Sequence, residues 1–127
     1  MTKHTLREAQ ELLPEARRRV GEITELVSQL QRLAGQMREG EAPSHAADDL
    51  ASLEAAVDDA FLWFEEHAVQ VKSLAPALLD FPARAIRDGE PIDVLLCWRD
   101  DEDTIAYYHP PETGYISREP VALLDDV

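Results

Sequence analysis

The first forty residues carry hydrophobic side chains at steps that alternate between three and four. The series begins at Leu6 and reaches Met37 without losing its phase. This spacing aligns the side chains along one face of a helix, and it is the repeat that coiled coils use. It predicts one long helix from residue 6 to about residue 38.

Two local features bear on this helix. Thr5 and Glu8 have the spacing of a capping box, in which the Thr5 hydroxyl accepts the Glu8 amide N–H and the Glu8 side chain reaches the Thr5 amide N–H. Pro14 conflicts with the helical pattern, because it has no amide hydrogen and disfavours helical geometry at Leu13. We expect either a kink near Pro14 or a short first helix that restarts there.

A second helix follows a break at residues 40–43, which contain a glycine and a proline. Ser44 is a candidate N-cap for this helix. Hydrophobic residues then step by four and three from Ala46 to Phe64, and we expect the helix to end near His67. Because the connection is short, the two helices are predicted to lie antiparallel.

After His67 the pattern changes to alternating, β-branched residues, which is typical of strands. Recurring prolines exclude another long helix. Strands are expected at residues 68–72, 77–81, 92–99 and 104–109, with a turn at residues 87–90. The predicted fold is α+β in one domain: a long, coiled-coil-like antiparallel helical hairpin (residues 1–67) followed by a small antiparallel β-sheet (residues 68–127).

Residues 95–110 have the pattern of a β-hairpin with several chemically versatile side chains. Pairing its strands across the acidic loop sets Cys97 opposite Ala106, and side-chain alternation then places Cys97 and His109 on opposite faces. A nucleophilic Cys–His pair is therefore not expected unless a bulge shifts the register by one residue. We expect Cys97 to be a buried small apolar residue.

The face that carries Trp98 is mostly apolar. We expect it to pack on the end of the helical hairpin, with His109 at its rim. The alternative interpretation is a shallow pocket lined by aromatic residues, to which Asp80, Arg99, His109 and Arg118 offer polar contacts.

The charge balance limits the partners. The chain of 127 residues has 26 acidic residues against 12 lysines and arginines, a net charge of −14. This field opposes binding to nucleic acid and to an anionic membrane surface. Neither a signal peptide nor a stretch of about 20 apolar residues is recognisable, so we expect a cytoplasmic location.

Motifs for metals and cofactors are also missing from the sequence. The one cysteine excludes an internal disulfide and a cysteine-based zinc site, and the four histidines form no HExxH motif. Residues 100–103 are acidic but lack the spacing of a calcium loop, and the five glycines are scattered. We therefore expect no metal ion, no cofactor and no catalytic residue.

Several short segments, spread over nearly the whole chain, have a recognisable combination. They are TLREAQELLPEAR, VKSLAPALLDFPA, LLCWR, AYYH and GYISREP. Together they resemble an uncharacterised bacterial family, domain of unknown function 2203. The resemblance implies a fold without an assigned activity, and it marks five polar residues as family positions: Lys72, Asp80, Arg99, His109 and Arg118. The chain departs from the family pattern at Ala68, where a glycine usually precedes the VxVK segment.

Two functions fit these features. The first is an interaction or assembly module that forms a homodimer through its helices or takes a protein partner, because apolar residues flank the main stripes of both helices. These flanking residues are Leu12, Leu26, Leu33, Phe61 and Trp63. The second is a small ligand-binding protein or weak enzyme that uses Asp80, Arg99, His109 and Arg118, with Lys72 as a further candidate for ligand binding. Convergence of the first four side chains on a concave site would favour the second function.

Overall fold

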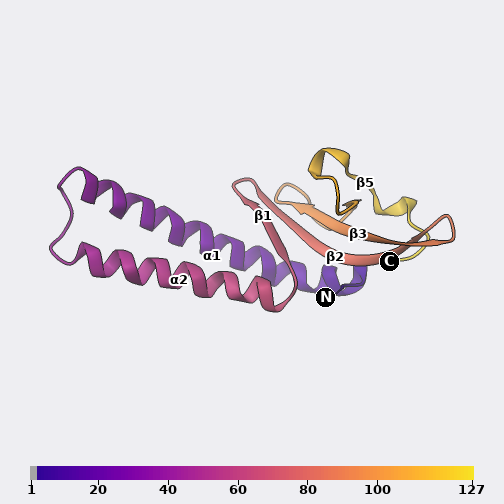
Figure 1. Cartoon of the computed structure of the whole chain (residues 1–127), viewed down its shortest axis with the longest axis horizontal. Coiled ribbons are helices and arrows are strands. Elements are labelled where there is room, and N and C mark those ends of the chain that lie inside the picture. Colours follow the sequence, from indigo (N-terminus) through magenta and orange to yellow (C-terminus); the bar gives the residue numbers. More distant parts are fainter. Residues whose placement is uncertain (1–2) are drawn as a thin grey trace.

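The computed structural model describes residues 3–127 as a helical hairpin followed by a five-stranded antiparallel sheet (Figure 1). The helices are α1 (Leu6–Arg38) and α2 (Ala46–Glu66). The strands lie side by side in chain order: β1 (Gln70–Leu74), β2 (Ala77–Arg87), β3 (Glu90–Arg99), β4 (Tyr107–His109) and β5 (Glu119–Pro120). Two short 3-10 helices, η1 (Tyr115–Ser117) and η2 (Val121–Leu123), flank β5. The predicted α+β fold is confirmed.

Helix α1 is continuous through Pro14, so of the two alternatives expected there, the short first helix that restarts at this residue is wrong. Leu13 and Ala16 on either side of the proline are both buried, and Pro14 itself is exposed. Packing on both sides therefore outweighs the lost hydrogen bond. At the N-terminus the Thr5 hydroxyl accepts the Glu8 amide N–H at 3.1 Å as predicted, but the Glu8 carboxylate contacts the Thr5 hydroxyl, also at 3.1 Å.

The start of α2 differs from the prediction, and its end agrees. Ser44 does not cap the helix; it lies in a turn in which the Ala46 amide N–H bonds to the Pro43 carbonyl at 3.1 Å. The helix ends at Glu66, one residue before the expected end. Ala68 then adopts a left-handed backbone with φ of 54°, and the strand starts at Gln70.

The core lies between the base of α1 and one face of the sheet, which we call the inner face. Ile23 is the last residue of α1 whose side chain is buried in this core. The inner face contributes Leu79, Phe81, Leu96, Trp98 and Tyr108. Beyond this base, the hairpin projects past the sheet as an arm, defined here as residues 24–60 (Figure 1).

The register of β3 with β4 is one residue away from the predicted register. Cys97 faces Tyr107 rather than Ala106, and Leu95 faces His109. Cys97 and His109 therefore share one face, and the predicted placement on opposite faces is wrong. The cause is a contact with α1: the Gln10 side-chain amide pairs with both the N–H and the C=O of Ile105 at 3.1 Å, which keeps residues 104–106 out of the strand.

We predict that Ala68→Gly raises the free energy of unfolding by about 0.5–1 kcal/mol. The left-handed backbone strains a residue with a Cβ atom, and glycine removes this strain at some cost in chain entropy. Ala55→Gly, at an exposed position inside α2, is the matched control and should lower stability by about 1 kcal/mol. Urea unfolding measures both changes; a destabilised Ala68→Gly would contradict the assignment of this turn.

Candidate functional site

The face of the sheet opposite the core, which we call the outer face, is partly covered by residues 110–118. A pocket of about 230 Å³ lies between this segment and the strands. Its lining comes from four strands, β1 to β4, and from the covering segment: Lys72, Leu78, Asp80, Leu95, Cys97, His109, Pro111, Thr113, Gly114 and Tyr115. The pocket therefore depends on strand register and on the path of the chain after β4.

Three polar side chains form the floor of this pocket. Asp80 and Cys97 are each 2% exposed and His109 is 3% exposed. Asp80 and Cys97 are direct partners across β2 and β3, and His109 projects from β4 onto the same face. The His109 Nε2 and Asp80 Oδ2 atoms are 3.1 Å apart, and the nearest ligand atoms of all three residues lie within 4.8 Å of one another.

The histidine is oriented by its second nitrogen. His109 Nδ1 lies 2.8 Å from the Pro110 carbonyl oxygen, which can only accept a hydrogen bond. Nδ1 therefore carries a proton, and Nε2 faces Asp80. The contact between Nε2 and the Asp80 carboxyl group holds one further proton, because one of the two atoms must donate.

Cys97 is not an activated nucleophile in this arrangement. Burial, and secondarily the neighbouring Asp80 carboxylate, raise the pKa of the Cys97 thiol to about 12, so the thiol is protonated at neutral pH. The two nitrogens of His109 contact Pro110 and Asp80, so the imidazole does not bridge the thiol to the carboxylate. A Cys–His–Asp nucleophilic triad is thus excluded for this geometry.

Tyr115 lines the pocket and is held by two arginines. Its hydroxyl accepts hydrogen bonds from Arg99 at 2.9 Å and from Arg118 at 3.3 Å. The Arg118 guanidinium also lies 4.2 Å from the Tyr115 ring centroid and 4.3 Å from that of Tyr107. These contacts fix the covering segment over the sheet.

The Arg118 guanidinium has a largely buried acidic partner. Arg118 Nη1 and Glu102 Oε1 are 2.9 Å apart, and the two side chains are only 14% and 15% exposed. The same carboxylate accepts the Arg99 backbone N–H at 2.7 Å, so Glu102 joins the loop after β3 to the covering segment.

The five predicted site residues divide into two groups. Lys72, Asp80 and His109 line one pocket, as a concave site requires. Arg99 and Arg118 do not line it but position Tyr115. Sequence reasoning missed Cys97 and Tyr115 as lining residues, although both lie in the LLCWR and GYISREP segments. His109, expected at the rim of the Trp98 face, lies instead on the outer face.

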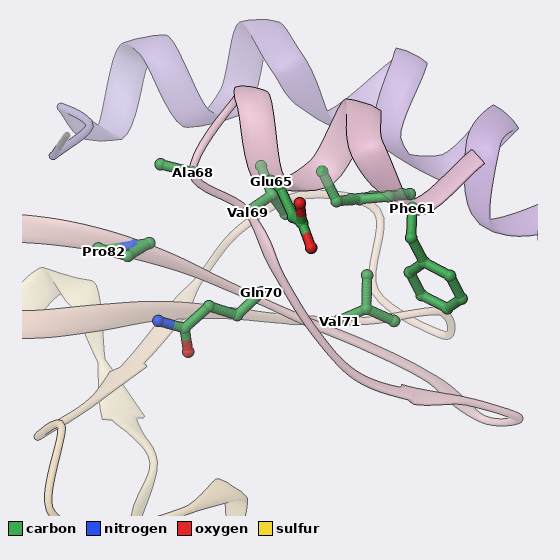
Figure 2. Close-up of a pocket in the computed structure, with 8 residues that line it drawn as sticks. Phe61, Glu65, Ala68, Val69, Gln70, Val71 and Pro82 are labelled. Carbon is green, nitrogen blue, oxygen red and sulfur yellow. The ribbon is translucent and has the colours of Figure 1, made fainter. Parts of the chain in front are cut away.

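A larger cleft of about 490 Å³ lies where α2 meets β1 (Figure 2). Apolar side chains such as Phe61, Val71 and Pro82 dominate its lining, with Glu65 and Gln70 as the longer polar side chains. Figure 2 shows Phe61 beside Val71 at one end of the cleft. No group of buried polar side chains among its lining residues converges on this cleft, so the outer-face pocket is the better candidate site.

A family model described as an uncharacterised conserved protein, DUF2203, matches residues 3–121. The chain belongs to this family. No curated protein matches this DUF2203 chain, and no solved structure does. Within the described residues, no helix combines the length and the apolar character that a membrane crossing requires.

The matched range of the DUF2203 model includes every residue that lines the outer-face pocket and both arginines that hold Tyr115. The pocket is therefore built entirely from the part of the chain that defines the family.

We predict that Arg118→Ala lowers the free energy of unfolding by about 3 kcal/mol, because it leaves the Glu102 carboxylate largely buried without its cation. Arg99→Ala is the matched control. Its ion pair with Asp101 is more exposed, so its loss should cost at most about 1 kcal/mol. Denaturant titration of both variants tests the ranking, and equal losses would contradict the structural role given to Arg118.

Proposed function

We propose that the protein binds a small acidic molecule in the outer-face pocket. The observation that supports this function is the convergence of Asp80, His109 and Lys72 on one concave site. Buried ionisable groups at the floor of a pocket are more typical of binding sites than of structural cores. A buried ion pair alone contributes little net stability, so stability does not account for the cluster.

The charge of the ligand follows from Lys72. This side chain is exposed at the pocket wall, and no ion pair within residues 3–127 involves it. Arg99 and Arg118, in contrast, are paired with Asp101 and Glu102. An anionic group on the ligand would therefore face Lys72, while the rest of the molecule meets the Asp80–His109 pair and the apolar side chains of the strands.

The size of the pocket restricts the ligand further. Pockets for drug-sized ligands have about 300–1,000 Å³, and this one has about 230 Å³. A metabolite-sized carboxylate, phosphate or sulfonate fits this volume, and a nucleotide or a peptide does not.

We expect at least one class of small organic acid to raise the melting temperature. A ligand present at 100 times its Kd stabilises the folded state by about 2.7 kcal/mol. A thermal-shift panel of small carboxylates, phosphates and sulfonates should show this effect in the wild type and lose it in Lys72→Ala. Arg84→Ala removes an exposed cation from the same face of β2, outside the pocket, and should respond like the wild type. A Lys72→Ala variant that responds like the wild type would contradict the proposal.

Self-association through the arm is a second candidate function. No α1 residue after Ile23 is buried, and between Ala46 and Phe64 no α2 residue is buried. Leu26 and Leu33 are half-buried on the arm. Leu12, Phe61 and Trp63, expected to belong to the same apolar flank, pack against the core of their own chain.

A second copy of the chain is the occupant that fits the arm. Two antiparallel hairpins related by a twofold axis form a four-helix bundle and cover the half-buried leucines. In such a bundle the acidic residues of α2 can lie beside the basic residues of the other copy's α1, including Arg32 and Arg38. The net charge of −14 opposes the pairing, but salt screens exposed charges beyond about 8 Å.

We predict a dimer at micromolar concentration, measured by light scattering at two salt concentrations. The double variant Leu26→Glu/Leu33→Glu should weaken the dimer by more than about 100-fold, because unpaired carboxylates at an interface lose their hydration. Ser28→Glu/Gln31→Glu adds the same charge at two exposed arm positions and should weaken it far less. A monomer in high salt, where repulsion is weakest, would rule out the dimer.

A further inference from the structure

We propose that Asp80, Cys97 and His109 bind one divalent transition-metal ion of the zinc class, with a fourth position open to the pocket. The ion site stands on these three donors alone. Only the further step, that the part of the small acid which meets the Asp80–His109 pair occupies the fourth position, rests on the proposed function.

The donor atoms are already close to the arrangement that such an ion needs. A tetrahedral zinc ion with its usual bond lengths separates its ligand atoms by about 3.4–3.6 Å. The His109 Nε2–Asp80 Oδ2 separation is 3.1 Å, and the largest separation in the group stays within 4.8 Å. Small side-chain rotations therefore suffice, with no movement of the strands.

The second nitrogen of His109 supports the same assignment. Histidine ligands of metal ions almost always donate their other ring N–H to a carbonyl or carboxylate, which fixes the ring and its tautomer. The 2.8 Å contact from His109 Nδ1 to the Pro110 carbonyl oxygen provides this bond. Nε2 is thereby directed toward Asp80, where the ion would sit.

The charges of the site balance when the ion is bound. An aspartate, a thiolate and a neutral imidazole carry two negative charges, and a divalent cation cancels them, so no net charge is buried. Binding releases to solvent the proton shared by Asp80 and His109 and the thiol proton of Cys97. The charge of Arg118 acts on the Cys97 thiol, and this guanidinium is paired with Glu102 at 2.9 Å.

The donor set also selects the kind of ion. Calcium and magnesium take oxygen ligands, whereas one sulfur, one nitrogen and one oxygen donor favour zinc and its first-row neighbours. Three protein ligands with a fourth position facing a pocket are typical of sites where zinc binds a substrate or activates water. The 230 Å³ pocket provides that open side.

Cobalt(II) is the probe for this site, because it replaces zinc and absorbs visible light. The full-length protein, stripped of metal with a chelator, is titrated with cobalt and then with zinc. A thiolate-to-cobalt charge-transfer band can come only from Cys97, the one cysteine of the chain. We expect this band to saturate at one equivalent and to disappear when zinc displaces the cobalt.

Two site variants and one control complete the experiment. Cys97→Ser should lose the band. His109→Gln should lose more zinc affinity than the about 10–100-fold that is lost when an outer partner of a ligand is removed. His45→Gln, at an exposed histidine near Asp49, should bind like the wild type. Absence of the band in the folded wild type would overturn the proposal, and this outcome does not depend on whether the variants fold. Unchanged zinc affinity in Cys97→Ser would also overturn it.

The spectrum also separates this inference from the proposed function. Cobalt binding whose visible bands do not respond to any small acid would support the ion site and count against the acid ligand. Thermal stabilisation by an acid in metal-free protein, without the charge-transfer band, would overturn the ion site and leave acid binding intact.

Discussion

The antiparallel pairing of β2 with β3 is the constraint on which the rest of the structure depends. Ten consecutive residue pairs, from Leu78–Arg99 to Arg87–Glu90, fix the face of every side chain on these strands. One face becomes apolar and must be buried, and the base of α1 buries it. The same register turns Asp80 and Cys97 together to the other face, so a slip of one residue would exchange the core with the site.

Neither α1 nor α2 contributes a residue to the lining of the pocket on the outer face. A short segment lies over it instead, attached through Tyr115 to Arg99 and Arg118. This cover leaves a pocket above Asp80, Cys97 and His109 rather than closing over them. The long arm lies on another part of the molecule, so the proposed binding site and the proposed dimer interface use different residues (Figure 1).

The features that could be predicted from sequence were those with local causes. Helical spacing located both helices, and the turn at residues 87–90 follows from its residue types, with Asp88 and Gly89 both at positive φ. The β3–β4 register could not be predicted, because it depends on Gln10, 95 residues away from Ile105 in the chain. Lys72, Asp80 and His109 were identified as candidates from the sequence. The placement of Cys97 and His109 on one face could not be predicted without the β3–β4 register.

The most direct test is an anomalous diffraction map, recorded at the zinc absorption edge, from crystals of the protein grown with one equivalent of zinc. The account predicts one dominant peak on the outer face, within bonding distance of Asp80, Cys97 and His109, with a further ligand on the pocket side. Zinc bound only at surface carboxylates, with the His109–Asp80 contact unchanged at full zinc occupancy, would contradict it.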